Sequence, residues 1–234
     1  WADLITLRGL PRLQQADMVF YDRLADPALL AHARTGAALV YVGKAPGCHS
    51  MAQGQINDLM VRAARQGQRV VRLKCGDPGV FGRGAEEAAA LGAAGTDWEI
   101  VPGVTAACAA AASARSFLTE RGRTERLILA TGHLRHDGAQ DWTTTAMPGT
   151  TLACYMGVAQ AGAIMAGLLA AGWPPESPVQ VISKAQTRAE QVFGCRLDDL
   201  QTLCGRHPAI NPAILLIRWE LPVTATAHAL AEGR

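Results

Sequence analysis

A glycine-rich loop in the first half of the chain has the residue types of a ligand-binding turn. It follows the β-branched run at 69–71, begins at Arg72-Leu73-Lys74-Cys75-Gly76-Asp77-Pro78, and ends at an Ala/Glu-rich stretch that predicts a helix. A strand that breaks into a glycine loop and then a helix is where open α/β proteins hold small ligands. The loop has neither the GxxxxGK[ST] nor the GxGxxG spacing. It therefore predicts a ligand that is not held by its phosphates.

Polar residues also follow three other strand-like runs. Asp22-Arg23 follow residues 18–21, Gly43-Lys44 follow residues 38–42, and Thr105 comes shortly after residues 98–101. Strand-like runs that alternate with helical ones predict βαβ units, whose right-handed crossovers place the strand ends at one edge. Turns attract Gly, Pro and Asp whatever the function. The isolated Lys44 and the Asp22-Arg23 pair favour a functional site over ordinary turns.

A second series of strand-like runs occupies residues 127–130, 151–155, 179–182 and 213–217. The last two are compatible with antiparallel pairing, which would make this sheet mixed. We therefore predict an α/β protein of two lobes, with a mainly parallel sheet in residues 1–115 and a mixed sheet in residues 122–234. The active site is expected in the cleft between the lobes.

Composition excludes several classes of protein. The chain has 234 residues, 49% hydrophobic and 18% charged, which is typical of a globular protein. A net charge of +2 without a Lys/Arg block argues against a nucleic-acid surface. The apolar stretch 104–114 is too short to cross a membrane and predicts a packed helix. Six scattered cysteines, and His133 and His136 without a third ligand, predict no metal site. No signal segment is visible, so a cytoplasmic location is expected.

Six segments of the chain together resemble the tetrapyrrole (corrin/porphyrin) methylases, in particular the uroporphyrinogen-III C-methyltransferases. These segments are residues 20–24, 41–44, 72–78, 80–84, 101–106 and 155–157. The resemblance extends from Asp3 to about Glu220. It implies a homodimer of two-lobed α/β subunits that methylates uroporphyrinogen III at C2 and then C7. The product, precorrin-2, forms via precorrin-1 and serves sirohaem, cobalamin or haem d1 synthesis.

The resemblance also implies S-adenosylmethionine as methyl donor and S-adenosylhomocysteine as product. This donor carries no phosphate, so the glycine loop has only to allow close approach of its backbone. By resemblance, the residues that line the donor are Cys75, Gly76, Asp77, Val80, Thr105, Ala106, Met156, Ala185 and Ala213.

The acceptor is a macrocycle with many carboxylates, which arginine binds well. By resemblance, the substrate-side residues are Arg23, Arg83, Glu86 and Arg121, and the proton acceptor and donor are Asp22 and Lys44. Plainer readings exist for three of them. Arg83 suits a solvated helix start, Glu86 suits the helix dipole, and Asp22 suits a simple turn.

The chain departs from the family pattern at several points. It starts just after the position of the family's first strand and Gly-x-Gly-Pro-Gly-Asp loop, so unpaired strand edges are expected in the first lobe. Cys75 stands in place of a glycine. If this position needs positive φ, the side chain costs about 1–2 kcal/mol; if it needs only close approach, the thiol would crowd the donor. Gly79 replaces an aromatic residue and Glu120 replaces a histidine. Alternative functions are therefore a methylase of a later precorrin and a catalytically impaired paralogue that still binds donor or tetrapyrrole.

Overall fold

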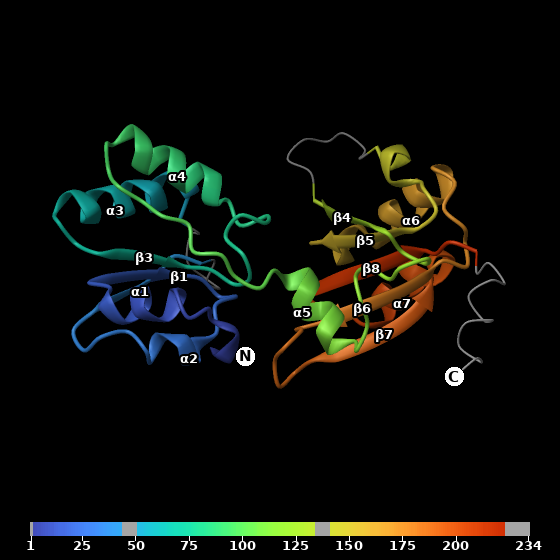
Figure 1. Cartoon of the computed structure of the whole chain (residues 1–234), viewed down its shortest axis with the longest axis horizontal. Coiled ribbons are helices and arrows are strands. Elements are labelled where there is room, and N and C mark those ends of the chain that lie inside the picture. Colours follow the sequence, from blue (N-terminus) through green and yellow to red (C-terminus); the bar gives the residue numbers. More distant parts are fainter. Residues whose placement is uncertain (1, 44–50, 134–140, 223–234) are drawn as a thin grey trace. The chain divides into compact units, whose positions relative to one another are not determined.

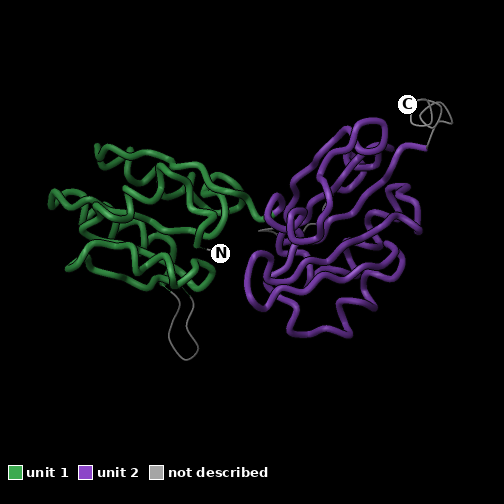
Figure 2. Tube along the Cα trace, turned by 60° about the horizontal axis from the view of Figure 1, so that its bottom comes forward, with its two compact units in different colours: residues 1–106 green, residues 107–234 purple. Residues whose placement is uncertain are grey.

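The computed structural model describes residues 2–43, 51–133 and 141–222 (Figure 1). The chain divides into two compact units, residues 1–106 (unit 1) and 107–234 (unit 2) (Figure 2). The expected junction was 115–122, whereas the division falls at the start of helix α5 (Ala106–Ser113). Helix α5 is bonded to unit 2, because the Ala107 N–H donates to the Tyr155 hydroxyl at 3.1 Å.

Unit 1 contains a parallel three-stranded sheet in the order β2-β1-β3. The strands are β1 (Met18–Tyr21), β2 (Ala38–Tyr41) and β3 (Val70–Leu73), and they confirm three predicted strands. Met18 is in register with both Ala38 and Val70, so the carboxyl ends of the three strands lie at one edge.

Helices cover both faces of this sheet (Figure 1). They are η1 (Ala2–Leu4), α1 (Gly9–Gln15), α2 (Pro27–Leu30), α3 (Gln53–Arg65) and α4 (Gly84–Ala93). Val19 and Leu13 belong to the core on the α1 side, whereas Phe20 and Ile56 belong to the core on the α3 side. The alternation of Val19 and Phe20 shows that both faces of β1 are buried.

The predicted strand at residues 98–101 is wrong. Trp98 and Ile100 are 49% and 51% exposed, and the segment forms no ladder. Within the described residues, β3 pairs only with β1, and its outer edge is not extended by this segment. Isolated contacts hold the segment instead: Glu99 pairs with Arg12, and the Thr6 hydroxyl donates to the Pro102 carbonyl at 3.4 Å.

Unit 2 contains a mixed five-stranded sheet in the order β4-β5-β8-β6-β7. The strands are β4 (Arg126–Thr131), β5 (Thr150–Tyr155), β6 (Pro178–Ser183), β7 (Gln191–Arg196) and β8 (Ala213–Trp219). Strands β6 and β8 pair antiparallel, with Val179 opposite Ile217, which confirms the mixed sheet. Strand β7 was not predicted. It is a half-exposed edge strand, and Gly194 interrupts its pattern.

The core of unit 2 lies between the sheet and helices α6 (Ala161–Ala170) and α7 (Leu200–Arg206). Leu152 and Leu215 from the sheet pack there with Leu168 and Leu200. Tyr155, three residues after Leu152, points to the opposite face, where it meets α5. Short 3₁₀ helices complete the unit: η2 (Thr143–Thr145), η3 (Val158–Gln160) and η4 (Leu197–Asp199).

None of the helices in the described part of the chain combines the length and apolar composition of a membrane span.

Candidate functional site

Two loops of unit 1 are packed backbone to backbone. Gly76 has a φ of +79°, which favours glycine, and a Cβ built on it would lie 3.5 Å from the Ala106 nitrogen. A Cβ on Gly103 would lie only 2.3 Å from the Gly76 carbonyl oxygen. Asp77 joins the loops, since its Oδ2 accepts from the Gly103 N–H at 3.0 Å and its Oδ1 accepts from the Gly79 N–H at 2.8 Å. The structure thus brings the predicted segments 75–77 and 105–106 together.

Cys75 does not carry the left-handed backbone of this turn. The positive φ belongs to Gly76, and Cys75 is not among the non-glycine residues with positive φ. The cost of a left-handed conformation therefore does not arise at Cys75, whose side chain is exposed. Further along the loop, Phe81 and Arg83 do adopt positive φ, at 50° and 57°.

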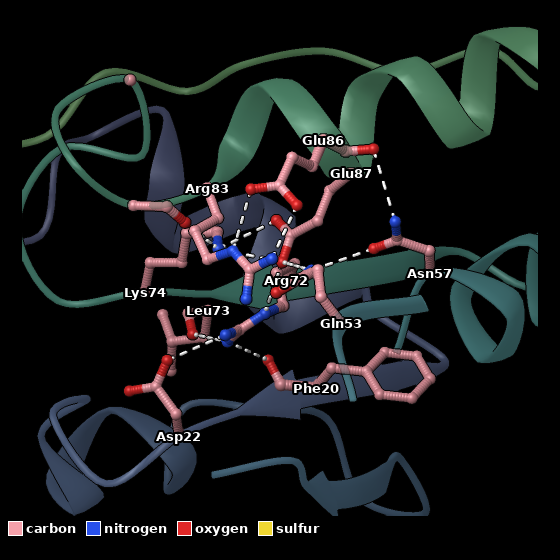
Figure 3. Close-up of polar contacts among 12 residues, drawn as sticks. Phe20, Asp22, Gln53, Asn57, Arg72, Leu73, Lys74, Arg83, Glu86 and Glu87 are labelled. Carbon is pink, nitrogen blue, oxygen red and sulfur yellow. Dashed lines mark hydrogen bonds and ion pairs between the residues drawn. The ribbon is translucent and has the colours of Figure 1, made fainter. Parts of the chain in front are cut away.

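A network of buried charges lies beside this loop (Figure 3). Asp22 follows β1, where its Oδ1 accepts from the Leu24 N–H at 3.0 Å and its Oδ2 accepts from Arg72 Nη2 at 2.8 Å. Arg72 lies in β3 and its side chain is only 14% exposed. Its Nη1 donates to the Leu73 carbonyl at 2.7 Å, and its Nε donates to Glu87 Oε1 at 3.3 Å. Arg72 therefore fixes one carboxylate oxygen of Asp22.

Lys74 extends the network to the glycine-rich loop. Its Nζ donates to Glu87 Oε1 at 3.0 Å and to the Gly82 carbonyl at 2.6 Å. Burial lowers the pKa of Lys74, and the hydrogen bond to Glu87 acts in the opposite direction. Gln53 Nε2 adds a third donor to Glu87 Oε1, at 3.1 Å. The ammonium group of Lys74 therefore points into the network.

Three residues of this network, Arg72, Lys74 and Glu87, were not predicted from the sequence. A signal was present for the two cations, because residues at positions i and i+2 of an extended segment share one face. In place of Glu87, the residue predicted from the sequence was its neighbour Glu86, which pairs with Arg83 instead.

Arg83 and Glu86, both predicted on the substrate side, pair with each other. Arg83 Nε and Nη2 donate to the two Glu86 oxygens at 2.9 and 2.6 Å, and this pairing raises the pKa of Arg83. Both side chains are substantially exposed, at 49% and 40%. Arg23 is exposed on the turn after β1, and Arg121 is exposed in unit 2. Lys44 lies outside the described residues.

The three predicted donor residues of unit 2 lie at one edge of its sheet. Met156 follows β5, Ala185 follows β6 and Ala213 begins β8. The register pairs Tyr155 with Ile214 and Ser183 with Ala213, so these positions are near one another.

The backbone at this edge is unusual. Met156, Lys184 and Gln186 have positive φ values of 54°, 48° and 57° although none is glycine. The Lys184 N–H donates to the Pro212 carbonyl at 2.7 Å. Such conformations persist only where neighbouring contacts hold them.

A polar cluster provides some of the contacts that stabilise the backbone at Gln186. Glu190 Oε2 accepts from the Gln186 N–H at 2.6 Å and from the Ser113 hydroxyl at 2.5 Å. The Gln186 side chain also donates to Ser113 Oγ at 3.1 Å. This cluster ties the segment that contains Ala185 to the end of α5. No sequence signal marks it, because Ser113 lies far away along the chain.

Glu120, one of the departures from the family pattern, is paired. Its carboxylate accepts from Arg123 Nη1 at 3.0 Å, and Arg123 Nη2 also donates to Glu220 at 2.6 Å. Across residues 2–43, 51–133 and 141–222, no three His, Cys, Asp or Glu side chains form a possible metal site.

Comparison with known proteins shows which family the chain resembles. The family model of the Tetrapyrrole (Corrin/Porphyrin) Methylases matches residues 2–201. The siroheme synthase of Zymomonas mobilis is 45% identical over 217 residues, which cover 92% of this chain and 46% of that protein. The siroheme synthase of Edwardsiella ictaluri is 41% identical over 216 residues, with the same coverage. The chain spans about half the length of these curated relatives.

Two solved methyltransferase structures are also similar to this chain. Uroporphyrin-III C-methyltransferase from Thermus thermophilus, complexed with S-adenosyl homocysteine, has a TM-score of 0.79 and 35% identity, covering 92% of this chain and 91% of that one. A cobalt precorrin-4 methyltransferase of cobalamin biosynthesis has a TM-score of 0.82 and 32% identity, covering 93% and 90%.

Proposed function

The chain belongs to the tetrapyrrole (corrin/porphyrin) methylases, and we propose that it transfers methyl groups from S-adenosylmethionine to uroporphyrinogen III. The methyl groups go to C2 and then C7, so that precorrin-1 and then precorrin-2 form. The observation that carries the proposal is the paired loops of unit 1, joined by Asp77, in a chain similar to a methyltransferase that holds S-adenosyl homocysteine. The chain would supply the methylation part of siroheme synthesis.

The paired loops fit a donor without phosphates. The left-handed Gly76 and the tight approach at Gly103 leave backbone and small side chains at the loop surface. Lys74 is engaged by Glu87 and the Gly82 carbonyl, so it is not presented to an anion. In this proposal Cys75, Gly76, Asp77, Val80, Thr105 and Ala106 hold the donor, with Met156, Ala185 and Ala213 as its unit 2 residues. When bound, the donor supplies an electrophilic methyl group on a sulfonium.

The chain's own residues then orient the acceptor and take up a proton. Arginine pairs with carboxylate in a bidentate manner, so Arg23 and Arg121 are the exposed guanidiniums that we assign to the macrocycle's carboxylates. Arg83 joins them by exchanging Glu86 for a substrate carboxylate. The methylated macrocycle must lose a proton, and Asp22 is the carboxylate that we assign to receive it. Lys44 keeps its predicted role as proton donor.

Two further expectations belong to this proposal. The enzyme acts as a homodimer in the cytoplasm, as the resemblance implies. Nucleic acid and membrane are not expected partners.

The proposal is tested by the masses of the products. We expect uroporphyrinogen III to gain two methyl groups in the presence of S-adenosylmethionine, and later precorrins to gain none. Methylation of a later precorrin alone would instead support the kind of activity suggested by the cobalt precorrin-4 methyltransferase likeness. Calorimetric binding of S-adenosylhomocysteine without any turnover would indicate an impaired paralogue.

The role of Asp22 is tested by Asp22→Asn, with Asp58→Asn, an exposed position on α3, as the matched control. We expect the first variant to lower kcat by roughly 10²–10⁴-fold, with S-adenosylhomocysteine affinity unchanged. The control should behave as the wild type. If Asp22→Asn retains full kcat, Asp22 is a turn residue only.

A further inference from the structure

One buried carboxylate joins two parts of the unit 1 site. Glu87 lies in the first turn of α4, and its side chain is 7% exposed. Arg72 Nε, Lys74 Nζ and Gln53 Nε2 all donate to its Oε1, at 3.3, 3.0 and 3.1 Å (Figure 3). Arg72 lies in β3, Lys74 directly follows it and Gln53 lies in α3, so Glu87 connects the sheet with both helices on that face.

Each of the two cations leads from Glu87 to a different loop. Arg72 continues to Asp22 Oδ2 at 2.8 Å, on the turn after β1. Lys74 continues to the Gly82 carbonyl at 2.6 Å, within the glycine-rich loop. Glu87 is the member of this chain of contacts that both cations share.

We propose that Glu87 is a positioning residue that holds the Asp22 turn and the glycine-rich loop in one fixed arrangement. The inference rests on the proposed function in that it assigns Asp22 to proton transfer and the loop to the donor. Glu87 acts only through Arg72 and Lys74. Its effect on catalysis is to keep the proton acceptor and the donor loop in register with each other.

Stability alone does not account for this arrangement. Burying two cations with their carboxylates costs desolvation, and apolar residues of similar volume are often at least as stabilising. The lowered pKa of Lys74 has the same cause. What the ion pairs provide is direction, because each bond fixes one atom of a loop: Asp22 Oδ2 on one side and the Gly82 carbonyl on the other.

The first test is Glu87→Gln, which keeps the volume and removes the charge. We expect kcat to fall by roughly 10- to 100-fold, as for a small misplacement of reacting groups, and S-adenosylhomocysteine affinity to fall several-fold. The matched control is Glu99→Gln, which breaks the exposed pair with Arg12 in the same unit. The control should leave both quantities within twofold of wild type. A Glu87→Gln variant that does the same overturns the proposal.

A second variant separates positioning from stability. Glu87→Gln leaves Lys74 buried without its carboxylate, so some loss of stability is expected. Lys74→Met combined with Glu87→Gln removes that buried charge and should recover much of the unfolding free energy. Its kcat should nevertheless stay low, because the loop remains detached. Recovery of kcat in parallel with stability overturns the proposal.

A third readout does not depend on activity. In Glu87→Gln, amide hydrogen exchange should accelerate both at residues 22–24 and at residues 75–82. If neither segment changes, Glu87 does not couple them and the proposal fails, whatever the wild type methylates. If both change while the wild type fails to methylate uroporphyrinogen III, the proposed function fails and the coupling stands.

Discussion

The strand-end loops of unit 1 and of unit 2 are held by different means. In unit 1, glycines allow two backbones to touch, and buried ion pairs around Glu87 fix the turns. In unit 2, Met156, Lys184 and Gln186 adopt left-handed conformations that cost about 1–2 kcal/mol each. The turns of unit 1 thus depend mainly on space and charge, although Phe81 and Arg83 in its loop are also left-handed, whereas the turns of unit 2 depend on hydrogen bonds that oppose backbone strain. The two sets of loops should therefore fail under different substitutions.

The largest effect is expected from Gly103→Ala in unit 1. The new Cβ would lie 2.3 Å from the Gly76 carbonyl oxygen, and neither backbone can move without shifting its loop. Overpacking of this kind costs about 1–3 kcal/mol or more, and the donor loop should be displaced with it. Urea unfolding should show the loss of stability, and calorimetry should show weakened S-adenosylhomocysteine binding.

Gly54→Ala is the control for that variant. It lies in α3 with nothing within 4 Å of an added Cβ, and alanine is a better helix former than glycine. Its stability should be equal or higher. Unchanged donor affinity in Gly103→Ala would show that the two loops need not touch.

In unit 2, the corresponding substitution is Glu190→Gln, which weakens the hydrogen bonds to Glu190. The Gln186 N–H and the Ser113 hydroxyl would lose a charged acceptor, at an expected cost of roughly 1–2 kcal/mol. We expect the segment 184–187 to relax and donor affinity to fall, while Glu176→Gln, an exposed change in the same unit, has no effect. Thermal unfolding and calorimetry are sufficient to measure both. If Glu190→Gln is silent, the strain in unit 2 is held by other contacts.

Most strands could be predicted from the sequence because local pattern and tertiary environment agree. Residues 70–73 and 213–217 are mostly apolar runs, interrupted only by Arg72, that end at polar residues, and both are strands. Residues 98–101 have a similar pattern but no partner among the described strands, and pairing decides whether a run becomes a strand. Residues 191–196 show the opposite case. Their pattern does not predict a strand, but they form one because they pair with β6.

The site was predictable to the extent that it follows the strand ends. Segment 75–77 follows the end of β3. Segment 105–106 was expected after a strand at 98–101 that does not form, but the structure packs it against Gly76. Glu87 and Glu190 were not predictable in this way, because each acquires its role from residues distant in the sequence. Glu87 binds cations 13 and 15 residues away, and Glu190 binds a serine 77 residues away. Contacts at such separations depend on the whole fold.

A smaller effect is expected when backbone strain in unit 2 is relieved. Lys184→Gly should relieve the left-handed backbone at φ 48° and raise the unfolding free energy by about 1 kcal/mol, after the entropy cost of glycine is subtracted. Lys184→Ala removes the same side chain but keeps the strain, so it should give no gain. Chemical denaturation of the pair measures the difference. Equal stability of the two variants would mean that position 184 stores no strain.

The smallest effect concerns a charge cluster at the other end of the unit 1 sheet. Asp17 precedes β1 and accepts from the Arg69 N–H at 2.7 Å and from Arg34 Nη2 at 2.6 Å. The backbone hydrogen bond from Arg69 is the main cause that lowers the Asp17 pKa from 3.8 to about 2. A carboxyl with a lowered folded-state pKa stabilises the protein above its unfolded value and loses that contribution as pH falls through the folded one.

Asp17→Asn should therefore be less stable than wild type above about pH 4, and the difference should shrink as pH falls toward 2. Acid titration of urea unfolding measures it. At neutral pH the variant should bind S-adenosylhomocysteine as tightly as wild type, because Asp17 lies at the amino end of β1 and the site lies at the carboxyl end. Weaker binding would show that this charge cluster also shapes the donor site. Unchanged binding would show that the cluster contributes to stability without shaping that site.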